Sequence, residues 1–302
     1  MGDIIHLTVY SLLTSNYKLK MESIYTAMSL EKSKFGKTII SDKVIKFYMH
    51  NDRINSELRK LDSMHTRSLY NLITGNNGST LYEYLSRFYG QGYIRTDNDY
   101  EYIKPEDCLD IVYDFLKVCS PMLSKIFTKA YKDGRIIFTN KSKEVNFKTG
   151  NVKKNYIILN KLCNYHDICV LVHELGHMYA DCFCEFDFND SNSILVSECF
   201  SMYLEYYFNQ YCIYNKMFLN DTKKESINFY NCTLKYIFDS MKRGISDLDR
   251  EFALKYALGG VISMDTYNKY GDCSLEEIYK YFSKNNLMYI IGDLRSKSFR
   301  RK

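Results

Sequence analysis

The fold is decided by residues 168–180, which read ICVLVHELGHMYA. The apolar residues on both sides of the polar ones favour a buried helix. Residues four apart lie on one face of a helix, so His173 and His177 can bind a single metal ion. Glu174, next to the first histidine, can take a proton from a metal-bound water. The alternative is a pair of core histidines whose hydrogen bonds are satisfied within the protein.

A third ligand must come from elsewhere, because a catalytic zinc site uses three protein ligands and keeps one position open. No histidine follows His177, so a carboxylate is expected. Residues 193–205, SILVSECFSMYLE, are typical of a second buried helix that begins at a serine N-cap. Its two carboxylates, Glu198 and Glu205, are two turns apart and share a face. We expect Glu198 to bind the metal and Glu205 to accept the second N–H of a ligand histidine, unless Glu205 is a solvated surface residue.

Other candidate ligands follow the motif closely. Cys182 and Cys184 are separated by one residue, whereas zinc-binding cysteine pairs are usually separated by two. Glu185, Asp187 and Asp190 lie in a polar connection, where carboxylates are usually solvated. These five residues are therefore weaker candidates than the helical glutamate.

With these motifs the chain resembles the M3 metallopeptidases, and within them the oligoendopeptidase F-like branch. Members carry H-E-x-G-H on one helix and E-x-x-S on the next, and the second glutamate is the third zinc ligand. Residues 155–160 resemble the family's strand ahead of the zinc helix, and residues 252–260, FALKYALGG, resemble a Tyr/Ala/Gly segment near the substrate. The resemblance extends over residues 100–290. The residues that match the two metal motifs are His173, Glu174, Gly176, His177, Glu198 and Ser201, with Glu205 also in place.

The resemblance implies a mainly α-helical, zincin-like fold that binds one Zn2+ ion. It implies that Ser201 and Glu205 support the metal ligands and that Tyr256 stabilises the oxyanion. It also implies that Gly259 and Gly260 let the substrate approach the backbone. The alternatives are a core tyrosine and a pair of glycines that end a helix.

The chain also departs from the family pattern. It is much shorter than a typical member, and the shortfall is N-terminal. Ala180 stands where a histidine is often found, and Phe252 stands where a tyrosine is expected. Residues 245–250 lack the histidine that contacts substrate in the family. The metal chemistry is therefore better supported than the details of substrate polarisation.

Composition is that of a globular enzyme. The 302 residues are 46% hydrophobic and include only two prolines, which permits long helices. No run is long enough for a transmembrane helix, and the N-terminus lacks the basic region of a secretory signal. We therefore expect a cytoplasmic protein with reduced cysteines and no membrane partner. The net charge of +5 is mild, and the basic residues 295–302 are expected to be a solvated end, so no nucleic-acid partner is indicated.

Two regions are expected along the chain. Residues 1–100 read as a helical N-terminal region and residues 101–302 as the catalytic domain, with the polar residues 95–99 at the boundary. Residues 104–107 open a helix that continues to about residue 118, because Pro105 suits a first helical turn. After the metal-binding helix the chain reads as helical, with breaks near residues 220–221 and 271–272.

A small β-sheet is predicted beside the metal-binding helix. Its strands are expected at residues 135–138, 144–147 and 156–159. In zinc peptidases an edge strand beside the metal-binding helix can pair with an extended peptide through main-chain hydrogen bonds. A hairpin that only covers the core is the alternative.

The sequence therefore predicts a zinc metallopeptidase that acts on short oligopeptides, with Glu174 as the general base. The shortened N-terminal part predicts an open cleft, which a second subunit could close, so a homo-oligomer is compatible with the sequence. Two other functions are compatible with the motif. A pseudo-peptidase that only binds peptides would explain the absent substrate histidine but leaves Glu174 without a purpose. A zinc hydrolase that cleaves a non-peptide amide has no specific support in the sequence.

Overall fold

The computed structural model describes residues 83–88, 91–97, 99–139, 145–147, 156–160, 164–183, 191–241, 247–285 and 287–296. Most of the predicted helical N-terminal region, residues 1–82, lies outside this description. At its described end, residues 83–86 form one helical turn, and residues 91–97 contain neither helix nor strand. The predicted domain boundary near residue 100 stays a prediction.

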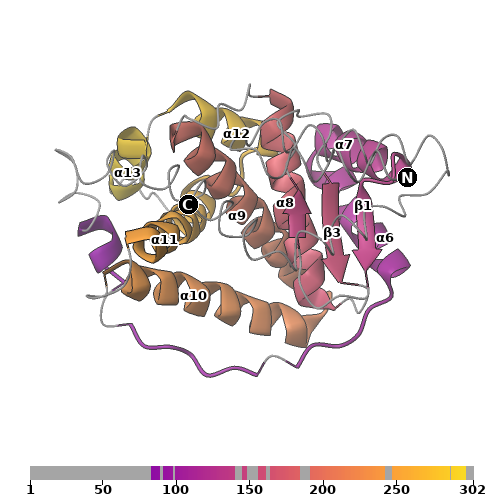
Figure 1. Ribbon diagram of the computed structural model, residues 1–302, viewed down its shortest axis with the longest axis horizontal. Coiled ribbons are helices and arrows are strands. Elements are labelled where there is room, and N and C mark those ends of the chain that lie inside the picture. Colours follow the sequence, from indigo (N-terminus) through magenta and orange to yellow (C-terminus); the bar gives the residue numbers. More distant parts are fainter. Residues whose placement is uncertain are drawn as a thin grey trace, which may run out of the picture.

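The described chain is mainly helical, which confirms that part of the predicted fold class. Among the described residues, two helices precede three short strands, and six helices follow the strands (Figure 1). The elements are α6 (Pro105–Cys119), α7 (Pro121–Lys132), β1 (Ile136–Thr139), β2 (Val145–Phe147), β3 (Tyr156–Asn160), α8 (Tyr165–Phe183), α9 (Ser191–Tyr214), α10 (Leu219–Met241), α11 (Asp247–Tyr270), α12 (Leu275–Lys284) and α13 (Leu287–Arg295).

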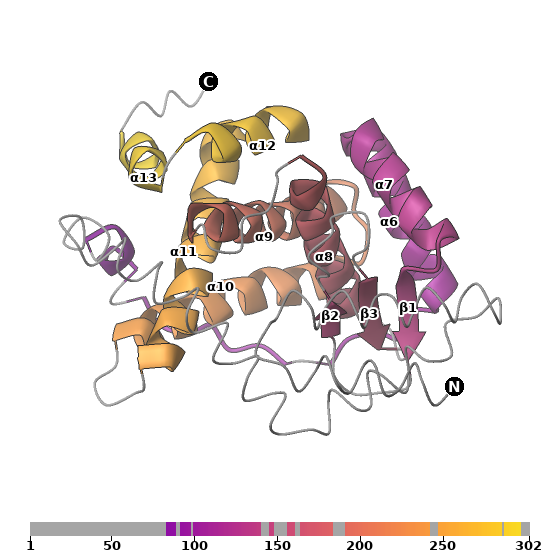
Figure 2. The same ribbon diagram turned by 45° about the horizontal axis from the view of Figure 1, so that its top comes forward.

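The three strands form one small sheet in the order β1-β3-β2. β3 is central, with β1 parallel to it, so that Ile137 is opposite Ile158. β2 is antiparallel to β3, with Asn146 opposite Ile157. β3 contacts α8, the β1 edge lies toward α6 and α7, and the β2 edge lies on the side of α10 and α11 (Figures 1 and 2).

The helix boundaries follow local chemistry. α6 begins at Pro105, whose missing N–H would have no helical partner at that position. Ser120 caps α7 by accepting a hydrogen bond from Leu123 N at 3.2 Å. The break between α9 and α10 falls at residues 215–218, where Lys216 and Phe218 have positive φ, so the prediction of a break at residues 220–221 is wrong by a few residues. The predicted break after Tyr270 is confirmed.

The core is built around α8 and α9. α9 contacts α8, α10, α11 and α12, and therefore lies at the centre of the helical layer (Figure 1). Its Phe200 ring stacks on Tyr179 of α8 at 5.2 Å between centroids, and both rings are buried. Because these two helices pack along their length, the polar side chains on their shared face are forced together in an otherwise apolar interior.

The segment before α6 runs along α10 without forming a strand (Figure 1). Asn231 of α10 binds the backbone of this segment at Ile94. The Asn231 side chain accepts a hydrogen bond from Ile94 N at 3.0 Å and donates one to Ile94 O at 2.7 Å. The Lys224 ammonium lies 2.9 Å from an Asp97 carboxylate oxygen. None of the described helices is both long enough and apolar enough to cross a membrane.

Candidate metal centre

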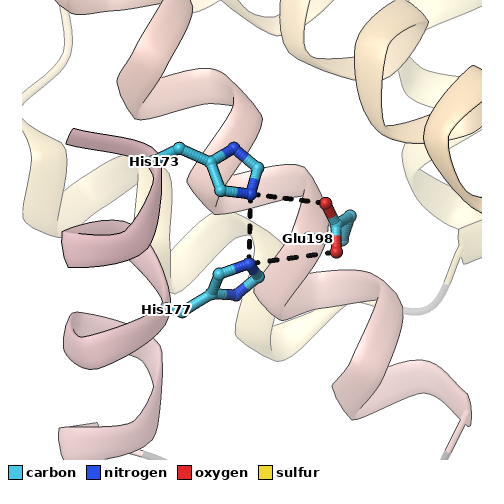
Figure 3. A group of neighbouring side chains, drawn as sticks. All are labelled: His173, His177 and Glu198. Atoms are coloured by element: carbon cyan, nitrogen blue, oxygen red, sulfur yellow. Dashed lines mark hydrogen bonds and ion pairs between the residues drawn. The ribbon is translucent and has the colours of Figure 1, made fainter. Parts of the chain in front are cut away.

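Two histidines and one glutamate converge between α8 and α9 (Figure 3). The Nε2 atoms of His173 and His177 are 3.1 Å apart. Glu198 Oε1 is 3.5 Å from His173 Nε2, and Glu198 Oε2 is 3.9 Å from His177 Nε2. Within the part of the chain that the structure describes, this is the one group of three or more His, Cys, Asp or Glu side chains whose ligand atoms converge, all within 4.8 Å.

The close approach of α8 and α9 depends on Gly176, which lies between the two histidines on α8. A Cβ atom added at Gly176 would lie 2.6 Å from Ser201 Cα and 3.1 Å from Ser201 Cβ. The distance of 2.6 Å to a backbone atom is shorter than real Cβ atoms show, so only glycine permits this spacing of the helices. Ser201 is three residues after Glu198 on α9, so the contact between Gly176 and Ser201 also fixes the position of Glu198 relative to the two histidines.

The outer nitrogen of each histidine has a partner on α9. His173 Nδ1 is 3.0 Å from Glu205 Oε2, and His177 Nδ1 is 2.7 Å from Ser197 Oγ. An imidazole that donates from Nδ1 presents the lone pair of Nε2, which is the form that binds a metal. Glu205 and Ser197 therefore orient both rings toward the space beside Glu198.

The two oxygens of Glu198 have different surroundings. Oε1 is buried and has no hydrogen-bond partner. Oε2 is 3.0 Å from the Lys255 ammonium of α11. Burial alone would raise the pKa of Glu198, but Lys255 and the two histidines hold it well below its usual range. Glu198 is therefore a carboxylate at neutral pH, with one oxygen free to bind a cation.

Nearby charges also shift the pKa of the neighbours of Glu198. Burial opposes a charge on His173, but the Glu198 and Glu205 carboxylates beside it outweigh burial and raise its pKa to about 10. Burial raises the pKa of Glu205, and the contact with His173 opposes that rise. Without a metal, His173 is thus protonated and positively charged at neutral pH, and a divalent cation would displace the proton from its ring.

These residues fit a metal ion. An unpaired buried carboxylate oxygen is costly, and a cation would satisfy Glu198 Oε1. Ligands about 2.0–2.1 Å from a tetrahedral metal lie roughly 3.3 Å from one another. The His173–His177 and His173–Glu198 separations of 3.1 and 3.5 Å are close to that value. The cluster of His173, His177 and Glu198 could therefore bind a metal with little rearrangement.

Glu174 and Tyr256 both lie at this centre. The charge of Glu174 contributes to the raised pKa of His173 and of Tyr256. The largest cause of the raised pKa of Tyr256 is the nearby Glu198 carboxylate. The Tyr256 ring stacks on Tyr236 of α10 at 5.1 Å between centroids. The structure therefore brings the two residues that were assigned catalytic roles to the same place as the three metal-ligand candidates.

The remaining candidates have packing contacts that the sequence did not anticipate. Ser201 donates a hydrogen bond to Ser197 O at 2.8 Å within α9, and contacts neither ligand histidine by hydrogen bond. Gly259 and Gly260 lie in the middle of α11, so they do not end a helix. A Cβ atom at Gly259 would be 2.6 Å from Met202 Sδ, and one at Gly260 would meet Thr233 of α10. A substrate-binding role for the two glycines stays a prediction.

The weaker ligand candidates are not described by the structure. The side chain of Cys182 and all of Cys184, Glu185, Asp187 and Asp190 lie outside the described part, as does the side chain of Phe252.

Sequence reasoning did not identify two residues that contact the ligands, Ser197 and Lys255. Ser197 directly precedes Glu198, and Lys255 directly precedes Tyr256. Both stand inside the segments that indicated the site, but their own residue types carry no metal-binding signal. Their roles depend on which helix faces pack together.

Comparisons with known proteins agree with this architecture. The chain matches no known family profile and no curated protein sequence. Its fold is similar to that of a protein from Bacillus anthracis str. Ames that is provisionally named oligoendopeptidase F, with a TM-score of 0.50 and 11% sequence identity. The alignment covers 95% of this chain and 64% of that chain, so this chain spans less than two thirds of the length of its neighbour. At this identity the similarity shows a shared, mainly helical fold.

Proposed function

We propose that this chain is a zinc-dependent metallopeptidase of the oligoendopeptidase F-like type, with a zincin-like catalytic domain that hydrolyses short oligopeptides. The observation that carries this proposal is the convergence of His173 and His177 on the buried carboxylate of Glu198, one oxygen of which has no hydrogen-bond partner. The similar fold of the Bacillus anthracis protein supports the same assignment. A cytoplasmic location is part of this proposal and agrees with the buried thiols of Cys169, Cys199 and Cys212.

Zinc is the metal that this donor set favours, because two imidazoles and one carboxylate form a common catalytic zinc site. When bound, zinc would supply a Lewis acid that lowers the pKa of water to near 7 and polarises a carbonyl group. His173 and His177 would bind it through Nε2, since their Nδ1 atoms contact Glu205 and Ser197. The three ligands leave a fourth position for water or substrate.

Glu174 is the general base of the proposed reaction. It follows His173 on α8, and its charge helps to raise the pKa of both His173 and Tyr256, which supports a role for its carboxylate at this centre. It would take the proton of the attacking water and deliver that proton to the nitrogen of the departing amine. The C–O bond to water forms first, and the C–N bond then breaks as the nitrogen receives the proton from Glu174, while the second proton of the water remains on the new carboxyl group.

Tyr256 is suited to donate a hydrogen bond to the oxygen of the attacked carbonyl. Its raised pKa keeps the phenol protonated at neutral pH, so the hydroxyl remains a donor. A donor fixed beforehand stabilises the negative charge that develops on this oxygen. The stacking of Tyr256 on Tyr236 fixes the ring before substrate arrives.

The sheet offers a place for an extended peptide. β3 is paired on both sides, whereas β2 has no partner strand on its outer side among the described residues. That side lies toward α10 and α11 (Figure 2). We infer that a peptide pairs with β2 by main-chain hydrogen bonds, which give affinity without a strong sequence preference.

A peptide-binding protein without activity is the second candidate. The sequence observation that favours it is the absence of a histidine in residues 245–250. The presence of Glu174 favours the enzyme, because binding alone needs no general base.

The test combines a quenched fluorescent oligopeptide library with metal analysis of the purified chain. Glu174→Gln keeps the shape of the side chain but removes the base, so zinc should remain at one per chain while cleavage falls by at least about 100-fold. Zinc without cleavage in the wild-type chain would favour the peptide-binding protein. Failure to bind any divalent metal would refute the proposed function.

A further inference from the structure

α11 brings a lysine into the candidate metal centre. The Lys255 ammonium is 3.0 Å from Glu198 Oε2, and its side chain is 20% exposed, whereas that of Glu198 is only 4% exposed. A lysine beside a metal ligand is unfavourable for metal binding as such, because the ammonium repels a divalent cation. Its presence therefore needs an explanation beyond charge balance.

The contacts of Glu198 supply that explanation. Lys255 contacts Oε2 of Glu198. This oxygen is 3.9 Å from His177 Nε2. Oε1, which is 3.5 Å from His173 Nε2, has no hydrogen-bond partner. The two oxygens are thus divided between a protein donor and the space in which a metal would lie.

We propose that Lys255 is a positioning residue that commits Glu198 to bind the metal through Oε1 alone. This inference rests on the proposed function and deepens it. A carboxylate can bind a metal through one oxygen or through both. Two histidine nitrogens, one carboxylate oxygen and a water would fill four positions around zinc, and a fifth position is left for the carbonyl oxygen of the substrate only if the carboxylate uses one oxygen. By holding Oε2, Lys255 keeps that position open.

The position of Lys255 is itself fixed by packing. Its ammonium lies 4.7 Å from the centroid of the Tyr256 ring, which is within the range of a cation–π interaction. Tyr256 in turn stacks on Tyr236. Gly259, one turn further along α11, lets this helix approach α9, because a Cβ there would be 2.6 Å from Met202 Sδ and 3.6 Å from Glu198 Cγ.

The proposal predicts an unusual sign for the effect of removing the lysine. Lys255→Met keeps the length of the side chain but removes the charge, so Oε2 becomes available as a second ligand and the repulsion of the metal ends. Metal affinity should stay the same or rise, whereas a side chain that only supported the structure of the site would lower affinity when removed. Catalytic turnover should fall at least tenfold, because the second oxygen occupies the fifth position, which the carbonyl oxygen of the substrate needs in the transition state.

The experiment compares the wild-type chain with Lys255→Met, Lys255→Arg and, as a control, Lys235→Met. Lys235 is an exposed lysine on the adjacent α10. Each protein is loaded with zinc, its affinity is measured by competition with a chelator, and its metal coordination is measured by X-ray absorption at the zinc edge. Circular dichroism monitors folding in each variant. Turnover is measured on a peptide that the wild-type chain cleaves.

In wild type, Lys255→Arg and Lys235→Met, we expect four ligand atoms. In Lys255→Met we expect five, with a longer mean metal–ligand distance and undiminished affinity. Four-coordinate zinc in folded Lys255→Met, or a loss of affinity in that variant, would overturn the inference while leaving the metallopeptidase proposal intact. If the wild-type chain binds no metal, the proposed function itself fails, and that outcome is visible before any variant is compared.

Discussion

Substitution of Gly176 by alanine is the sharpest test of how the metal centre is assembled. In the structure, the added Cβ would lie 2.6 Å from Ser201 Cα, a backbone atom of α9 that no side-chain rotation can move. Ordinary contacts for a Cβ begin at 3.4 Å, so α8 and α9 would have to separate by about 0.8 Å at this point. Glu198, one turn before Ser201 on α9, would move with that helix away from both histidines.

The expected effect has two components. Overpacking of a dense core costs about 1–3 kcal/mol of unfolding free energy, even though alanine favours a helix more than glycine does. Metal sites tolerate displacements of only about 0.5 Å, so a shift of about 0.8 Å should weaken zinc binding by roughly 10–100-fold. Both losses have the same origin, which is the spacing of the two helices.

The assay is urea unfolding of the metal-free protein together with chelator competition for zinc. Gly292→Ala is a matched control, because Gly292 is an exposed helical glycine of α13 whose added Cβ would meet no atom within 4 Å. That control should be neutral or more stable by about 0.5–1 kcal/mol, with unchanged zinc affinity. If Gly176→Ala binds zinc as tightly as the wild-type chain, the close contact between α8 and α9 does not set the geometry of the site.

Three further predictions concern the site itself. Glu205→Ala removes the acceptor 3.0 Å from His173 Nδ1 and should lower zinc affinity about 10–100-fold in chelator competition; unchanged affinity would show that the ring is oriented without it. Because the pKa of His173 is raised to about 10, this imidazole is charged in the metal-free site at neutral pH, and zinc must displace its proton. Affinity should therefore rise about tenfold per pH unit between about pH 6.5 and 8.5, and calorimetry in buffers of different ionisation enthalpy should detect the released proton; a flat profile would contradict this. Tyr256→Phe should lower kcat by about 10²–10³ with zinc content unchanged, and an equal kcat would exclude a role for this hydroxyl at the oxyanion.

Several features of the fold could be predicted because they depend on residues close together in the chain. Pro105 starts α6 as expected, and the strands lie within one residue of the predicted positions. The boundary between α9 and α10 was misplaced, because Lys216 and Phe218 adopt a left-handed backbone without the glycine that would indicate it.

The sequence by itself determined which residues could bind a metal together. The four-residue spacing of His173 and His177 places both rings on one face of any helix that contains them. Because no histidine follows His177, the third ligand is expected to be a carboxylate, and Glu198 is the candidate. These conclusions need only helical geometry and the ligand preferences of metals.

Only the tertiary structure decided which groups surround those ligands. Ser197 contacts His177 across 20 residues of chain, and Lys255 of α11 contacts Glu198 across the interface with α9. Periodicity shows that a helix has a buried face, but not which face of which other helix covers it. That choice depends on packing of the whole core, where the small volume of Gly176 and Gly259 permits the approach that brings these side chains together.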